Sequence, residues 1–186
     1  MLRAQNPSFL FFCMFKIRPT GGSGARFPTR IVNPETEGHI LDKVSEARGG
    51  LSNRFKETGN FAYAEVDVIG INKSEFYSHS GIHDPAKKIP GTENFSFKPE
   101  NPIFKATEAP NSNGGKPYLR DADTEYKILN DIANQLGDNV NAQGRIKLFT
   151  EKDTCSSCNG VINHFKIKYP KIEIKVVHNN GNMISP

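Results

Sequence analysis

Residues 120–129 read RDADTEYKIL and residues 150–158 read TEKDTCSSC, and these two stretches decide how the chain is interpreted. Each stretch leads into a segment whose apolar residues recur at helical spacing. The sequence therefore predicts helices over 123–136 and 155–169. Residues that can bind a metal ion or move a proton stand at the start of both helices: two acidic residues in the first and two cysteines in the second.

Outward from these helices, other segments alternate between apolar and polar residues, as half-buried strands do. We expect strands over 62–71, 74–80, 144–150 and 172–176, of which the first two form a hairpin. A further helix is expected over 37–56. Helices and strands in this order predict an α/β fold, a mixed β-sheet flanked by helices.

The composition is that of one globular domain. The chain has 186 residues, of which 36% are hydrophobic and 24% charged, and this excludes a coiled coil, a collagen and extensive disorder. Residues 1–36 hold a glycine run and scattered prolines, so we expect a poorly ordered leader or linker there and a folded domain over 37–186. No apolar run approaches the roughly 20 residues that cross a bilayer, which predicts no membrane span.

Charge and cysteine content narrow the classes of function. Lysine and arginine total 24 against 20 acidic residues, an excess that permits an anionic partner without requiring one. The three cysteines are Cys13 and the close pair Cys155 and Cys158. An odd number with one close pair argues against a disulfide framework and indicates a metal or redox site.

The starts of the two helices suggest a catalytic metal site. If the helices lie side by side, Asp123 meets the two thiolates, because both N-termini then point the same way. Three protein ligands leave the fourth position of a tetrahedral zinc open, which is typical of catalytic rather than structural zinc. Glu125 is placed to move the proton of a bound water. A redox pair and a structural zinc site are the alternatives for a lone C-x-x-C.

The long segment 81–119 holds six of the twelve prolines, so no regular element of any length is expected there. Its lysines are interleaved with Phe95, Phe97, Phe104 and Tyr118. Basic and aromatic side chains of this kind grip a nucleic-acid strand in some proteins. The alternative is a loop that its phenylalanines pin to the core.

With these motifs the chain resembles the zinc-dependent cytidine deaminase superfamily, whose usual signature is H-x-E followed by P-C-x-x-C. Asp123 stands here in place of the histidine and Thr154 in place of the proline. Both departures are similar to the deaminase domains of bacterial polymorphic toxins. The resemblance covers roughly residues 50–178 and implies a three-layer α/β/α fold. It also makes residues 1–36 a candidate toxin-fragment boundary.

The resemblance implies roles for matching residues. Asp123, Cys155 and Cys158 would bind Zn²⁺, and Glu125 would be the general acid and base. A carboxylate is a harder ligand than an imidazole, so the aspartate bears on which metal binds and how tightly.

Substrate contacts are assigned by the same resemblance to Ser80, His79 and Thr124. The first two lie at the end of the second expected strand, where such deaminases usually contact the target base or its sugar. For His79 the alternative is a hydrogen-bonded residue near a turn.

The function expected from the resemblance is hydrolytic deamination of cytosine to uracil in DNA, preferably in single strands, because a base inside a duplex must first be flipped out. Deamination of RNA or of a free nucleoside or nucleotide is an alternative, as are a non-catalytic zinc-stabilised binding module and a thiol oxidoreductase. The expected setting is that of a secreted or delivered antibacterial effector. It would act in the target-cell cytoplasm and be blocked by a cognate immunity protein.

Overall fold

The computed structural model describes residues 25–110 and 114–186. Its centre is a five-stranded mixed sheet in the order β1-β7-β6-β2-β3. The strands are β1 (Thr29–Ile31), β2 (Phe61–Val68), β3 (Glu75–His79), β6 (Gly144–Thr150) and β7 (Ile172–His178). β2 runs antiparallel to both β3 and β6, whereas β6, β7 and β1 are parallel to one another.

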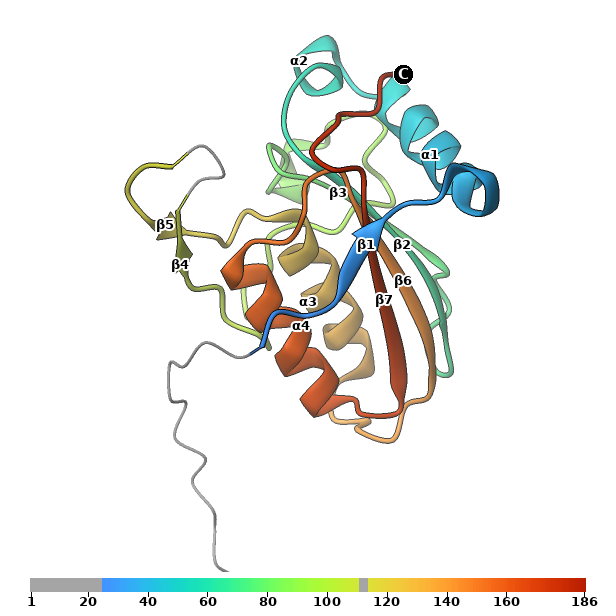
Figure 1. Ribbon diagram of the computed structural model, residues 1–186, viewed down its shortest axis with the longest axis vertical. Helices are drawn as coiled ribbons and strands as arrows, with labels where there is room; N and C mark the ends of the chain where they lie inside the picture. The colour runs from blue at the N-terminus through green and yellow to red at the C-terminus, as the bar shows by residue number, and fades with distance from the viewer. Residues whose placement is uncertain (1–24, 111–113) are drawn as a thin grey trace, which may run out of the picture.

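Helices cover both faces of this sheet, as Figure 1 shows. α3 (Thr124–Leu136) and α4 (Ser156–Lys168) lie side by side on one face, and α1 (Pro34–Gly49) lies on the other. The connecting segments hold the short helix α2 (Asn53–Lys56), the 3-10 turn η1 (Pro85–Lys87) and a small hairpin of β4 (Glu108–Ala109) and β5 (Tyr118–Leu119). The expected α/β fold with three layers is confirmed. None of the described helices is long and apolar enough to cross a membrane.

Alternation along the strands builds two separate cores. In β2, Ala62 and Ala64 face α3 and α4, whereas Phe61 and Tyr63 face the side of α1. β3, β6 and β7 contribute to both cores in the same way. Fully burying a large apolar side chain contributes about 1.5–3 kcal/mol, so a sheet with two apolar faces needs helices on both sides.

The helix expected over 37–56 is two helices, and it begins earlier than expected. Asn33 caps α1, since its Oδ1 accepts from the backbone N–H of Glu35 at 2.9 Å, and Pro34 occupies the first helical position, where no amide hydrogen bond is lost. The chain leaves the helix at Gly50, and α2 starts three residues later.

The structure differs from the expected boundary after residue 36. Residues 29–31 form the edge strand β1, with Thr29 opposite Val176, and the N–H of Val32 donates to the carbonyl of His178 at 2.9 Å. A three-residue edge strand is too short to show alternation, so the sequence carried no signal for it. Residues 1–24, including Cys13, lie outside the described residues.

The segment 81–119 is pinned to the domain by its aromatic residues. Phe104 is buried in the core beneath α3 and α4, Phe95 is buried in the core beneath α1, and Phe97 packs against the latter partly exposed. The interpretation that these rings grip a nucleic-acid strand is therefore wrong for Phe95 and Phe104. Tyr118, on β5, is exposed.

Candidate active site

The topology brings the starts of α3 and α4 together. β6 lies between the two helices in the sequence, and Asp123 and Cys155 are the residues just before the first turns of α3 and α4. The Sγ of Cys155 accepts from the N–H of Cys158 at 3.4 Å, which closes the first turn of α4. Both helix N-termini therefore lie at the end of the sheet where β6 finishes.

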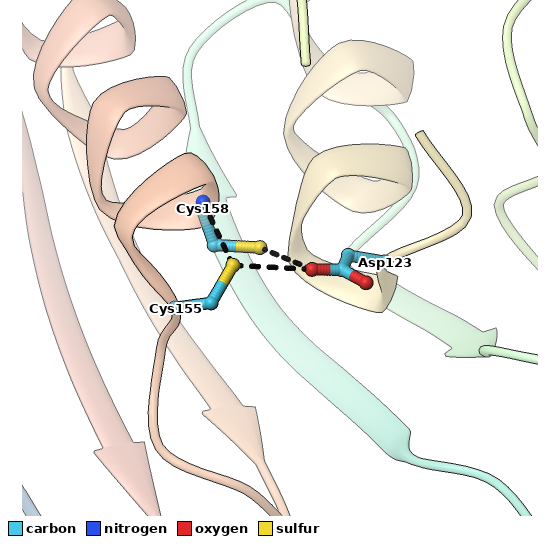
Figure 2. Close-up of side chains that lie close together, drawn as sticks. All are labelled: Asp123, Cys155 and Cys158. Atoms are coloured by element: carbon cyan, nitrogen blue, oxygen red, sulfur yellow. Dashed lines mark hydrogen bonds between the residues drawn. The ribbon is translucent and has the colours of Figure 1, made fainter. Parts of the chain in front are cut away.

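Figure 2 shows the three predicted ligands converging. Both thiols donate to one oxygen of Asp123, with Sγ–Oδ2 distances of 3.2 Å from Cys155 and 3.2 Å from Cys158. All three donor atoms lie within 4.8 Å of one another. Zinc binds sulfur at about 2.3 Å and carboxylate oxygen at about 2.0–2.2 Å, so tetrahedral ligands sit roughly 3.5–3.8 Å apart. The Sγ–Oδ2 distances of 3.2 Å are slightly shorter than this, as thiol–carboxylate hydrogen bonds are, and the donor set of two sulfurs and one oxygen fits zinc.

The two thiols are not equivalent. Interaction with the neighbouring Cys158 lowers the pKa of Cys155, whereas interaction with Cys155 and burial raise the pKa of Cys158. A metal ion binds the deprotonated sulfurs, so metal binding releases these protons.

Glu125 lies in the first turn of α3 with 4% of its surface exposed. Its Oε2 accepts from the hydroxyl of Thr124 at 2.9 Å and from the thiol of Cys158 at 3.7 Å. Burial, and after it the charge of Asp123, raise the pKa of the Glu125 carboxyl. A carboxyl with a raised pKa beside a metal site is suited to take up and return a proton near neutral pH.

Asn60 organises the site and was missed by the sequence analysis. Its Nδ2 donates to the hydroxyls of Thr124 at 2.7 Å and Thr150 at 2.9 Å, and its Oδ1 accepts from the N–H of Lys152 at 3.0 Å. These bonds join the start of β2 to the start of α3 and the end of β6. A lone asparagine before a strand has no spacing pattern that could have revealed this.

Of the three predicted substrate contacts, two line the cleft and one does not. Ser80 and Thr124 line the same cleft as Glu125. His79 does not: its ring is 1% exposed and packs edge-on against Phe55 and Phe61. His79 Nδ1 accepts from the N–H of Gly81, which leaves Nε2 to donate to the carbonyl of Thr58.

The cleft above the ligands has a volume of about 400 Å³. Asp123, Glu125 and Cys155 line it, together with Ser80 and Asn60. Other segments contribute to its wall: Arg26 from the chain before β1, Tyr118 and Arg120 from β5 and the residue after it, and Lys152 from the chain after β6. The guanidinium of Arg120 lies 4.7 Å from the centre of the Tyr118 ring.

A buried ion pair supports the segment that enters the cleft. Arg48 Nη2 donates to both oxygens of Glu151, at 2.7 and 2.6 Å, and neither side chain is more than 2% exposed. The other terminal nitrogen of Arg48 donates to the carbonyls of Phe55, Lys56 and Thr58. The backbone N–H groups of Phe61 and Ile184 complete the bonds of the carboxylate, both at 2.8 Å.

The fold and the site together define the class of the protein: it is a deaminase of the cytidine deaminase-like superfamily. A family model matches residues 44–180, which is most of the chain. The chain belongs to that family, the BURPS668_1122 family of deaminases, named Toxin-deaminase. Comparison with curated proteins and with solved structures finds no match.

Proposed function

We propose that this deaminase catalyses zinc-dependent hydrolysis of cytosine to uracil in DNA, with single strands as the preferred substrate. The observation that carries the proposal is the position of Glu125, which is buried beside the Asp123, Cys155 and Cys158 donors and lines the cleft. Family membership supplies the reaction class. The base, the nucleic acid and the metal are the parts that we propose.

The residues divide the chemistry between them. Asp123, Cys155 and Cys158 would hold the zinc, and the chemistry that zinc supplies when bound is activation of a water molecule at neutral pH. Thr124 donates to Glu125 Oε2, which leaves Oε1 to carry the proton. Glu125 would take one proton from the water as its oxygen bonds C4 of cytosine, and pass that proton to N3. It would then take the second proton of the same oxygen and give it to the amino group as the C4–N bond breaks. One water is consumed and one ammonia is released.

Features of the cleft support a strand over a free base. Arg26 and Lys152 place cationic groups at its wall, where phosphates of a strand would run, and Tyr118 offers an exposed ring. Extruding a base from a duplex costs a few kcal/mol, a cost that a single strand avoids. We extend the proposal to the setting that the family name suggests. The domain is an antibacterial effector delivered into the target-cell cytoplasm, and a cognate immunity protein covers its cleft.

The test is a set of matched substrates with one cytosine each: single-stranded DNA, duplex DNA, RNA and free deoxycytidine. Uracil in DNA is scored by glycosylase cleavage, uracil in RNA by sequencing, and the free nucleoside by absorbance. We expect uracil first in single-stranded DNA, loss of activity after chelation, and recovery on adding zinc. Conversion of RNA alone or of deoxycytidine alone would overturn the proposal that DNA is the substrate. The proposed deamination of cytosine would still hold.

The matched control is Glu125→Gln, which keeps the size of the side chain and removes the carboxyl that carries the proton. We expect activity to fall by about 10²–10⁴-fold while zinc content is unchanged. Equal activity in the variant would exclude Glu125 as the acid and base. Zinc binding without turnover on any substrate would identify a non-catalytic zinc module. Thiol–disulfide exchange that survives zinc removal would identify an oxidoreductase.

A further inference from the structure

An aspartate ligand changes the charge of the metal centre. Two thiolates and a neutral imidazole balance the two positive charges of zinc, but two thiolates and the carboxylate of Asp123 exceed them by one negative charge. A buried or half-buried excess charge is costly unless another group compensates it. The Asp-x-Glu sequence therefore raises the question of which residue supplies the missing positive charge.

Arg120 lies where that charge is needed. Its Nε donates to Asp123 Oδ2 at 2.9 Å, and this is the oxygen that both thiols approach. The two side chains are mostly shielded, at 14% exposed for Arg120 and 15% for Asp123. Within residues 25–110 and 114–186, Arg120 is the one side chain that forms an ion pair with Asp123.

The guanidinium of Arg120 is held in place from several sides. It lies over the ring of Tyr118, and its Nη1 contacts the hydroxyl of that residue. The backbone N–H of Arg120 donates to the carbonyl of Thr107 at 3.1 Å, and its own carbonyl accepts from the N–H of Asp123 at 3.3 Å. Arg120 and Asp123 are thus fixed to each other by backbone as well as side chain.

Lys152 also lines the cleft but forms no ion pair with Asp123 among the described residues, and two other nearby cations are engaged elsewhere. Arg26 pairs with Asp153. The Nζ of Lys127 donates to the carbonyls of His79 and Ile82, both at 2.7 Å, on the buried side of α3. Neither forms a hydrogen bond or an ion pair with Asp123.

We propose that Arg120 is the positioning residue that lets an aspartate serve as a zinc ligand in place of histidine. It supplies the positive charge that balances the centre, and it turns Oδ2 toward the two sulfurs. This inference rests on the proposed zinc function. It makes a distinct prediction, because the need for Arg120 depends on the charge of the residue at position 123.

The test is a double-mutant cycle with zinc affinity as the readout, measured on metal-free protein by competition with a chromophoric chelator. The four proteins are the parent, Arg120→Gln, Asp123→His and the double variant. We expect Arg120→Gln to weaken zinc binding by about 10–100-fold, as loss of an outer-sphere partner does. In the Asp123→His background the same change should weaken binding less than about threefold, because a neutral ligand leaves no excess charge.

Two further variants serve as controls. Arg26→Gln removes the same charge from the cleft wall without touching Asp123, and it should leave zinc affinity within about threefold of the parent value. Arg120→Lys keeps the charge and loses the planar fork, so it should restore part of the affinity that Arg120→Gln loses. Circular dichroism of each metal-free protein checks that it is folded.

Three outcomes would overturn the inference. Equal losses in the parent background and in the Asp123→His background would show that Arg120 supports the site irrespective of ligand charge. Tighter zinc binding by Arg120→Gln would show that the guanidinium competes with the metal for Oδ2. A parent protein that binds no zinc would overturn both this inference and the proposed zinc dependence. The first two outcomes would overturn the inference about Arg120 alone.

Discussion

Two arginine–carboxylate pairs lie near the end of β6. They differ in how many hydrogen bonds the protein makes to the carboxylate and in how exposed the side chains are. In the first pair Arg48 Nη2 donates to both oxygens of Glu151, and both side chains are at most 2% exposed. Each residue also makes hydrogen bonds to the backbone. Arg120 and Asp123 share one bond through Nε and are each about one-seventh exposed, at 14% and 15%. The oxygen that accepts this bond also faces two thiols.

From this difference we expect the first pair to serve stability and the second to serve the proposed metal site. The carboxylate of Glu151 has every lone pair directed at a protein donor, so it can only hold the chain together. Asp123 Oδ2 accepts from Arg120 and from the two thiols, and the thiol protons are ones that a bound metal ion would displace. Replacing the arginine by glutamine should therefore lower the unfolding free energy strongly in the first pair and only slightly in the second.

The largest effect is expected from Arg48→Gln. Removing one partner of a buried pair leaves an uncompensated charge on Glu151 and costs about 3–5 kcal/mol of unfolding free energy. Urea denaturation of the metal-free protein measures it. Arg48→Gln combined with Glu151→Gln should recover part of the loss, since no charge is then left unpaired. A loss below about 1 kcal/mol for the single variant would remove the distinction between the two pairs.

A second effect concerns pH and His79, whose ring donates to the same carbonyl of Thr58 that Arg48 binds. Burial is the main cause that lowers the pKa of His79 to about 4, below the roughly 6.5 of an unfolded chain. Between these values the unfolded chain binds a proton that the folded one does not. Stability is therefore full above about pH 6.5 and falls as the pH drops toward 4.

The expected size of this pH effect is about 2 kcal/mol over that window, since one pKa unit corresponds to about 1.4 kcal/mol and part of the shift is relieved by relaxation. Urea denaturation at several pH values compares the parent with His79→Gln, which does not titrate. The variant should lose this slope whatever its absolute stability. Identical slopes would show that His79 is not the titrating group.

The third effect concerns the turn at Gly59. The residues on either side of it, Thr58 and Asn60, bond to Arg48 and to Thr124. Gly59 has φ +74°, and a Cβ there would lie 2.6 Å from His79 Cε1 and 2.9 Å from Ser80 Oγ. Gly59→Ala should cost about 2 kcal/mol, through a strained backbone and crowding together. Gly70→Ala is the matched control, because Gly70 also has positive φ, +95°, but open space around it. Thermal unfolding that shows equal losses would mean that crowding at Gly59 contributes nothing.

The smallest effect is expected from Arg120→Gln in the metal-free protein. A pair that solvent partly screens contributes about 0.2–1 kcal/mol, so unfolding free energy should change by less than about 1 kcal/mol. The same urea titration as for Arg48→Gln measures it. A loss as large as that of Arg48→Gln would mean that Arg120 is a structural residue. The two arginine–carboxylate pairs would then not differ in role.

Much of the fold was predictable because the long elements carry strong periodicity. The predicted strand over 144–150 is the observed β6, and both late helices were expected within one residue of their observed bounds. β1 was missed, because its position depends on pairing with β7 rather than on any pattern of its own. Asp123, Glu125 and the two cysteines were expected to lie together, and the structure brings them together because their positions follow from the helix starts.

The rest of the site depends on contacts that the sequence does not encode locally. Asn60 and Arg48 act through hydrogen bonds to residues 64 and 103 positions away. His79 was expected to contact substrate because the resemblance places that contact at the end of the second expected strand, but its ring turns into the core. Of the two residues expected at this strand end, Ser80 lines the cleft and His79 does not, a difference that the sequence did not indicate.

The sheet order has a consequence for when the domain can fold during its synthesis. β7 is the last strand of the sheet to be made, yet it lies between β1 and β6, so the parallel half of the sheet cannot assemble before it. Asp123 is translated 32 residues before Cys155, and the Ile184 amide that completes the bonds of Glu151 comes later still. A nascent chain whose residue 184 is still inside the ribosome therefore lacks one of the backbone hydrogen bonds that hold Glu151. The deaminase can complete the parallel half of its sheet only after β7 has emerged.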